Sequence, residues 1–143
     1  MATGVGVSDD CVTKFGELKL GHKFRYIVFK MSDDLTEIVV EKTAPNSADY
    51  DAFKADLPKD DCRYAVYDFE YDQPGGGGKR SKILFVLWSP DTAKIKSKML
   101  YTASLADLRK KLVGIGTEVQ ATDNSEIDYD EVLNKVTRGG TTA

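Results

Sequence analysis

Two pairs of alternating segments, each joined by a turn, constrain the fold of this chain most strongly. Residues 23–31 and 35–42 flank a Ser-Asp-Asp turn, and residues 63–71 and 82–88 flank a stretch with four consecutive glycines. Alternation of apolar and polar residues with period two is typical of strands, and turn residues between two such runs indicate a hairpin. We therefore expect two β-hairpins, the second with a long and flexible tip.

The segments between and around the hairpins have helical periodicity. Residues 8–18 begin with a capping serine followed by two aspartates, which are favourable at the positive end of a helix. A second short helix is expected to open at Pro45 and to stop at Pro58. Apolar residues at i, i+3, i+4 and i+7 predict a last helix over residues 129–136.

The longest helical segment, residues 92–113, carries two apolar stripes instead of one. The first stripe consists of Ile95, Met99, Ala103 and Ala106, and the second consists of Tyr101, Leu105, Leu108 and Leu112. A helix with one apolar stripe buries one side. Two stripes predict either a kink or burial on two sides, as in a helix that lies on a sheet beside another helix.

The order of elements predicts the fold class. It reads helix, hairpin, helix, hairpin, long helix, short edge strand at Val119 and Gln120, and helix. Strands paired through hairpins with helices on both sides give a single mixed α/β domain of the α+β type. A length of 143 residues suits one domain. We expect it to span residues 1–143, with a core at about 5–138 and flexible tails at 1–4 and 139–143.

Composition excludes several classes of function. A net charge of -3 provides no overall attraction to nucleic acid or to an anionic membrane. The chain has two cysteines, Cys11 and Cys62, and one histidine, His22, which is too few for a disulfide framework or a zinc site. We expect both cysteines in the core and His22 in an exposed or capping position. Gly78 and Lys79 lead into a strand, whereas a phosphate-binding loop of the Walker A type leads into a helix. An enzyme is therefore poorly supported.

The chain lacks the sequence signals of export and of membrane insertion. Its first residues include no basic region followed by an apolar stretch, and the longest apolar run, residues 83–88, is far short of a membrane span. We therefore expect a soluble intracellular protein.

Basic residues gather at two places and leave two interpretations open. Lys79, Arg80 and Lys82 flank the tip of the second expected hairpin, and the other group lies on the long helix. Lys98 and Arg109 are eleven residues apart on the long helix, so they project within about 20° of each other and roughly 16 Å apart along its axis. Lys96 and Lys110 mark a second basic side of this helix. Such residues are typical either of a solvated helix face or of a helix that binds another protein, and periodicity does not distinguish the two.

Three motifs resemble the cofilin/actin-depolymerising-factor family. They are DCRYAVYDFEY at residues 61–71, GKRSK at 78–82, and WSPDTA at 88–93 running into KSKM at 96–99. The resemblance covers residues 4–138. It implies a central mixed, mainly antiparallel sheet with helices on both faces, the actin-depolymerising-factor homology fold. It also implies binding to monomeric and filamentous actin with preference for the ADP form, and severing and depolymerisation of filaments without catalytic residues, metal or cofactor.

The resemblance also assigns two binding surfaces. The surface used for both monomer and filament would comprise Thr3, Gly4, Val5, Lys96, Lys98, Arg109 and Lys110, with Met99 as an apolar anchor. The surface used for the filament alone would comprise Lys79, Arg80, Lys82, Asn134, Lys135 and Arg138, with Asp33 and Glu37 as weaker candidates.

Three positions depart from the family pattern. Thr3 stands where the family usually has a phosphorylatable serine, so Thr3 is the candidate phosphorylation site. The acidic residue of the long helix is Asp107, one position later than usual, where Ala106 now stands. Asn134 replaces a common acidic residue.

The resemblance implies partners and a location as well. Phosphoinositide headgroups would compete with actin for the basic residues, and cyclase-associated protein and actin-interacting protein would assist disassembly. The protein would act as a monomer at cytoplasmic and cortical actin filaments, with a nuclear location left open. Two alternatives remain, namely a filament side-binder without strong severing that resembles coactosin, and a phosphoinositide-binding module.

Overall fold

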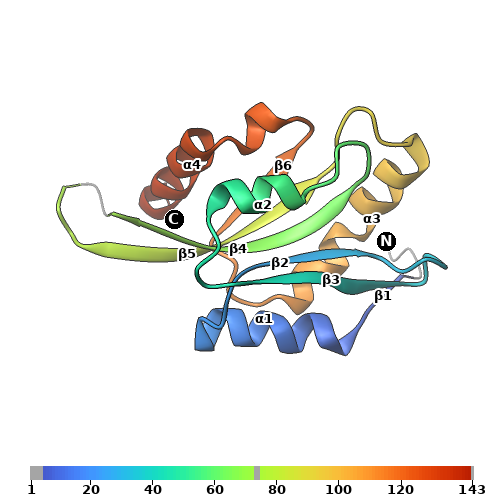
Figure 1. Ribbon diagram of the computed structural model, residues 1–143, viewed down its shortest axis with the longest axis horizontal. Coiled ribbons are helices and arrows are strands. Elements are labelled where there is room, and N and C mark those ends of the chain that lie inside the picture. The colour runs from blue at the N-terminus through green and yellow to red at the C-terminus, as the bar shows by residue number, and fades with distance from the viewer. Residues whose placement is uncertain (1–4, 73–74, 143) are drawn as a thin grey trace.

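The computed structural model describes the backbone of residues 5–72 and 75–142 and the side chains of residues 5–72 and 75–137. Within these residues, a six-stranded sheet has the order β1-β3-β2-β4-β5-β6 (Figure 1). The strands are β1 (Gly6–Val7), β2 (Phe24–Met31), β3 (Glu37–Pro45), β4 (Arg63–Asp72), β5 (Lys79–Trp88) and β6 (Thr117–Ala121). The four central strands pair antiparallel, and the edge strands β1 and β6 pair parallel with their neighbours. The expected mixed, mainly antiparallel sheet is confirmed.

Helices cover both faces of this sheet. They are α1 (Asp9–Gly21), α2 (Tyr50–Asp56), α3 (Ile95–Lys111) and α4 (Tyr129–Thr142), with a 3-10 turn, η1 (Asn124–Ile127), before α4. Helices α1 and α3 pack on one face, and α2 and α4 pack on the other. Because β4 is buried on both faces, its side chains alternate between the two cores, with Tyr64 and Val66 on the α1/α3 side and Ala65 and Tyr67 on the α2/α4 side.

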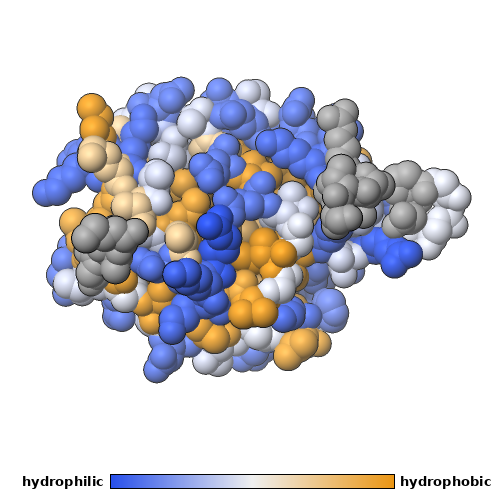
Figure 2. Space-filling view, turned by 180° about the vertical axis from the view of Figure 1, so that it is seen from behind, coloured by the Kyte–Doolittle hydropathy of each residue, from blue (hydrophilic) through white to orange (hydrophobic). Residues whose placement is uncertain are grey.

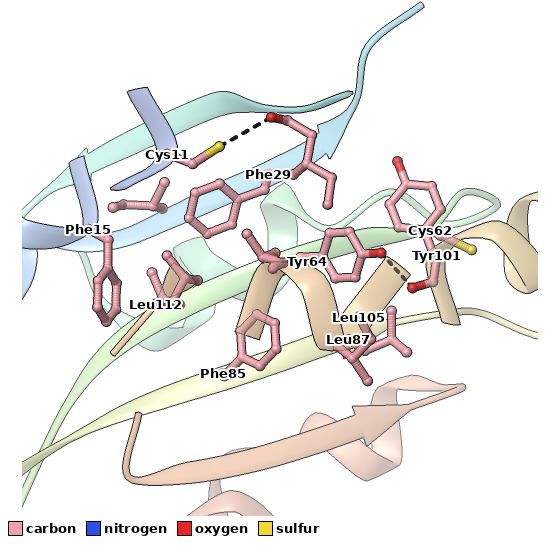
Figure 3. Packing of buried hydrophobic residues seen from close by; sticks show 14 of the residues in the cluster. Cys11, Phe15, Phe29, Cys62, Tyr64, Phe85, Leu87, Tyr101, Leu105 and Leu112 are labelled. Carbon is pink, nitrogen blue, oxygen red and sulfur yellow. Dashed lines mark hydrogen bonds between the residues drawn. The ribbon is translucent and has the colours of Figure 1, made fainter. Parts of the chain in front are cut away.

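Buried hydrogen bonds fix α3 to the sheet. The Tyr64 hydroxyl donates to the Tyr101 carbonyl at 2.5 Å, and the Met31 amide donates to the Tyr101 hydroxyl at 2.9 Å. Figure 3 shows Tyr64 and Tyr101 close together among the apolar side chains of this core. Helix α3 is therefore joined to both β2 and β4 by polar contacts in addition to its apolar packing.

Both cysteines are buried and unpaired, as expected of core residues. Burial is the largest effect on each thiol, and it raises the pKa of Cys11 and of Cys62. The Cys11 thiol also donates to the Ile38 carbonyl at 3.4 Å, which links α1 to β3 (Figure 3). The expected capping role of His22 is confirmed, since His22 ends α1 in the left-handed conformation with φ 49°.

Several element boundaries differ from those expected. Pro45 ends β3 instead of opening a helix, and α2 begins later because Asp49 caps it, accepting from the Ala52 amide at 2.8 Å. Strand β5 begins at Lys79, three residues earlier than expected, because ladder pairing with β4 continues to the Asp72–Lys79 pair. Strand β1 and turn η1 were not expected. Helix α4 continues to Thr142, through the segment predicted to be a tail.

Candidate protein-binding surfaces

The outer face of α3 is the most unusual surface of the molecule. The stripe of Tyr101, Leu105, Leu108 and Leu112 is buried, as one helix on one sheet requires. The other stripe faces solvent, with Ile95 75% and Met99 67% exposed and Ala103 and Ala106 also exposed. The expectation of burial on two sides is therefore wrong. A row of exposed apolar residues along one helix is typical of a site that binds another molecule.

An open hollow lies beside this apolar row. It has a volume of about 470 Å³ and is lined by Ser89, Ile95, Lys98, Met99, Thr102 and Ala103. Figure 2, which views the molecule from behind, shows apolar side chains in bands between strongly hydrophilic ones. The hollow and the row together offer a partner both a projecting and a recessed apolar surface.

Basic side chains border the apolar row on both edges. At about 100° per residue, Lys98 and Arg109 lie along one edge and Lys96 along the other, and Lys110 follows the row at its C-terminal end. All but the half-buried Lys98 are exposed. Among the described residues, no ion pair engages any of the three lysines. Their charges remain available to an acidic partner.

Arg109 differs from the three lysines because it is already engaged. Its Nη1 donates to Glu118 Oε1 at 2.6 Å, and Gln120 Nε2 donates to the other oxygen of Glu118 at 3.0 Å. Burial, the largest single effect, favours neutral Glu118, but the hydrogen bonds from Arg109 and Gln120 outweigh it and lower the pKa of Glu118. Strand β6 thus holds the Arg109 guanidinium in place. The sequence hinted at this contact only through the outward polar positions Glu118 and Gln120 of an edge strand.

The N-terminal strand lies beside α3. Strand β1 contacts α3, and Val5 is half-buried against the core under this helix. The structure therefore places Val5 next to the strand that contacts α3, with its side chain partly in the core. Thr3 and Gly4 lie outside the described residues.

The predicted departure at Ala106 and Asp107 is visible on α3. Ala106 is exposed on the outer face, whereas Asp107 is half-buried. The outer face consequently carries an apolar methyl group where an acidic side chain would otherwise lie. The apolar row therefore runs unbroken past the middle of the helix.

A second basic surface forms where the β4–β5 hairpin meets α4. The hairpin projects from the body of the molecule, and α4 lies over its base (Figure 1). Lys79 and Arg80 are exposed on the hairpin, and Asn134 and Lys135 are exposed on α4. Alternation along β5 places Arg80 and Lys82 on the face covered by α4 and Lys79 on the other face.

Lys82 and Arg138, which are assigned to the second surface, differ from the exposed residues named above. Lys82 is half-buried, and its Nζ donates to the Val136 carbonyl at 3.0 Å, so it joins the hairpin to α4 directly. The backbone of Arg138 belongs to α4, but its side chain is outside the described set.

The two acidic candidates, Asp33 and Glu37, lie apart from the basic residues of the hairpin. Strand β2 ends where β4 begins, as the Phe29–Tyr64 pair shows, so the β2–β3 turn lies at the opposite end of the sheet from the hairpin tip (Figure 1). Asp33 lines a pocket together with Ser97 at the start of α3, and Glu37 pairs with Gly6 of β1. Asp33 therefore lies near the start of α3, and Glu37 lies beside β1.

The described residues include no group of histidine, cysteine and acidic side chains that could hold a metal ion. In that same part of the chain, no helix combines the length and the apolar character needed to cross a bilayer.

Comparison with known proteins gives consistent similarities over nearly the whole chain. A family model described as "Cofilin/tropomyosin-type actin-binding protein" matches residues 4–137. Cofilin from Schizosaccharomyces pombe is 57% identical over 136 residues, which is 95% of this chain and 97% of the relative. Actophorin from Acanthamoeba castellanii is 54% identical over 133 residues, covering 93% and 95%.

A solved structure agrees with these relatives. The crystal structure of Streptomyces griseoflavus cofilin superposes with a TM-score of 0.89 at 51% sequence identity, covering 95% of this chain and 99% of that one. Sequence and fold therefore point to one family.

Proposed function

Because this chain belongs to the family of cofilin/tropomyosin-type actin-binding proteins, we propose that it binds actin monomers and filaments, and that it severs and depolymerises the filaments. The observation that carries the proposal is the exposed apolar row of Ile95 and Met99 between lysines. Such a row gains free energy when a partner removes it from water, at roughly 25 cal/mol per Å² of apolar surface.

The α3 surface would bind both monomer and filament. Met99 and Ile95 would act as apolar anchors in a cleft of actin, and Lys96, Lys98 and Lys110 would meet acidic groups around that cleft. Arg109 would be presented by Glu118, and the chain from Thr3 to Val5 would complete the surface beside the helix. The local positive charge of this surface would attract an acidic partner although the chain as a whole has a net charge of -3.

The hairpin surface would bind only the filament. Lys79, Arg80, Lys82, Asn134, Lys135 and Arg138 would contact a second actin subunit, which a monomer does not provide. The proposal rests on the projection of the hairpin from the body (Figure 1) and on the exposure of Lys79 and Arg80 there. Asp33 and Glu37, at the β2–β3 turn and the start of β3, would be weaker filament contacts outside the hairpin.

Severing would need binding free energy and no bond chemistry. A protein that binds the ADP form of the filament, and prefers one of its twist states, shifts the filament toward that state. Mismatch at boundaries between covered and bare segments would then promote breakage. The protein would act at cytoplasmic and cortical actin filaments, where cyclase-associated protein and actin-interacting protein would assist turnover.

Two kinds of regulation accompany the proposal. Phosphoinositide headgroups would compete with actin for the basic residues of both surfaces. Phosphate on Thr3 would add about -1.5 to -2 charges beside α3 and weaken contact with an acidic partner.

Imaging of single filaments at increasing protein concentration tests the proposal. We expect filaments to fragment, and cosedimentation to show the protein in the pellet. Pelleting without fragmentation would instead indicate a side-binder resembling coactosin. Protein that neither pellets with filaments nor accelerates their disassembly would refute actin-filament binding. Vesicles with and without phosphoinositide then test the competition.

A further inference from the structure

Lys82 is unlike the other basic residues of the hairpin. Lys79 and Arg80 are exposed, whereas Lys82 is half-buried and its ammonium group donates to the Val136 carbonyl of α4 at 3.0 Å. A charged donor forms a stronger hydrogen bond with a carbonyl than a neutral donor does. The ammonium group is thus directed into the molecule and toward α4.

The aliphatic part of Lys82 is also held in place. A Cβ atom added at Gly116 would lie 3.3 Å from the Cβ, Cγ and Cδ atoms of Lys82, so the absence of a side chain at Gly116 lets the lysine stem lie against the backbone. The Gly116 amide itself donates to the Ile83 carbonyl at 2.8 Å. Three segments therefore meet at Lys82, namely β5, the loop before β6, and α4.

This meeting point lies at the base of a two-stranded ribbon. Strand β2 pairs with β4 only at residues 64–67, and β6 pairs with β5 only at residues 84–88. Beyond these residues, 68–72 pair with 79–83 alone. An isolated two-stranded hairpin is only marginally stable. Contacts with the body must therefore set its direction. They include the buried ring of Phe69, which stacks on Tyr129 of α4 at 5.4 Å, and polar contacts at the base of the ribbon.

Two long basic side chains make such contacts on opposite sides. Arg25 of β2 donates from Nη1 to the Asp68 carbonyl at 2.9 Å and lies 3.4 Å from the Glu70 carboxylate. Lys82 makes the corresponding contact with α4. Arg25 therefore joins the ribbon to the sheet, and Lys82 joins it to the helix that bears Asn134 and Lys135.

We propose that Lys82 is a positioning residue for filament binding, which holds the hairpin and α4 in register so that Arg80 and Lys135 present one surface, and that its own ammonium group does not contact the filament. This inference rests on the proposed filament binding and changes the role of one residue in it. A residue in direct ionic contact contributes to the salt dependence of binding, whereas a residue that positions others does not.

The test compares Lys82→Met with Arg80→Ala in filament cosedimentation at several salt concentrations. Lys82→Met keeps the stem and removes the donor, and we expect it to weaken filament binding about tenfold without changing the salt dependence. Arg80→Ala is expected to weaken binding and to flatten the salt dependence. Lys82→Arg, which keeps a charged donor, should recover most of the binding. Monomer binding should be unchanged in all three variants.

Two results would overturn the proposal: unchanged filament binding in Lys82→Met, or a salt dependence flattened as in Arg80→Ala. Failure of the unmodified protein to bind filaments would instead refute the proposed function. Hydrogen exchange would still test the positioning role in that case. Faster exchange of the α4 amides at residues 134–137 in Lys82→Met would support it, and unchanged exchange would overturn it.

Discussion

The two basic surfaces of this protein are built in different ways. The α3 surface lies on a helix that packs along the sheet and is hydrogen-bonded to β2 and β4 through Tyr101. The hairpin surface lies on a two-stranded ribbon that leaves the sheet and on a helix joined to it by Lys82. The first surface combines apolar anchors with charge, whereas the second presents mainly charge. We therefore expect the first to supply most of the affinity and the second to supply filament specificity and salt sensitivity.

The largest expected effect concerns the apolar anchor of α3. Met99→Asp places a carboxylate at the centre of the proposed interface, where binding would have to remove it from water without a partner. We expect at least a hundredfold loss of affinity for monomer and filament alike, as at a binding hot spot. Fluorescence titration of labelled monomers and cosedimentation with filaments would measure it.

A matched control shows whether the loss of affinity in Met99→Asp is specific to α3 or follows from placing a charge at any exposed apolar residue. Leu20 at the end of α1 is 79% exposed, more than Met99, and lies outside the apolar row. Leu20→Asp should leave both affinities unchanged. Equal losses in the two variants would show that α3 has no special role.

The next largest effect is expected from double alanine substitutions of basic residues. They test directly whether the two surfaces have different roles. Lys96→Ala with Lys98→Ala should weaken monomer and filament binding together, by about tenfold. Lys79→Ala with Arg80→Ala should weaken filament binding by a similar factor and leave monomer binding intact. Equal losses in both assays for the second pair would refute the assignment of two surfaces. Lys59→Ala, which removes an exposed charge before β4, serves as the control.

The polar contacts under α3 lead to a smaller effect, on stability. Tyr101→Phe removes the acceptor of the buried Met31 amide. An unsatisfied buried donor costs about 1–3 kcal/mol, so we expect a lower free energy of unfolding by about that amount in urea denaturation. Tyr129→Phe, at an exposed tyrosine of α4, should be nearly neutral. A neutral Tyr101→Phe would show that the contact with the Met31 amide is not needed to hold α3.

The contrast between the buried and the exposed stripe of α3 shows what the sequence could and could not predict. Periodicity located the helices and strands because each buries a regular face, and the central hairpin strands were found within a few residues. Periodicity did not reveal which stripe of α3 is buried, since Ile95 and Met99 are as apolar as Leu105 and Leu108. Only the position of the sheet decides this. The aromatic residue Tyr101 and three leucines fill that core, and the smaller stripe is left outside.

Contacts between distant residues were beyond prediction for a different reason. Lys82 and Val136 are 54 residues apart, and the lysine resembles its neighbours Lys79 and Arg80 in type and spacing. Its different role depends on the absence of a side chain at Gly116 and on the course of α4, neither of which has a local signal. The family resemblance identified candidate residues in both surfaces, but it could not show that Asp33 and Glu37 lie at the other end of the sheet from the β4–β5 hairpin tip.

The smallest expected effect concerns Glu118 and its contact with Arg109. The pKa of Glu118 in the folded protein lies below its ordinary value of 4.5, because hydrogen bonds from Arg109 and Gln120 outweigh the opposing effect of burial. A lowered folded pKa means that the unfolded chain binds the proton more readily. The contribution of the pair to stability is therefore fully present above pH 4.5 and is lost as the pH falls through the folded pKa.

Replacing Glu118 by glutamine should remove this part of the acid dependence. Because the Arg109 side chain is 48% exposed, we expect a loss of only about 0.5 kcal/mol at neutral pH and none at the acid end of the titration. Urea denaturation between neutral pH and pH 3 would show the two curves converging as Glu118 becomes protonated. The same variant replaces the charge-assisted contact of Arg109 with β6 by a weaker neutral one and leaves the charge of Arg109 in place. Monomer binding by Glu118→Gln therefore sharpens the contrast between the two surfaces. Weaker binding would mean that the α3 surface depends on an Arg109 side chain held in place by Glu118. Unchanged binding would mean that its apolar row and lysines suffice.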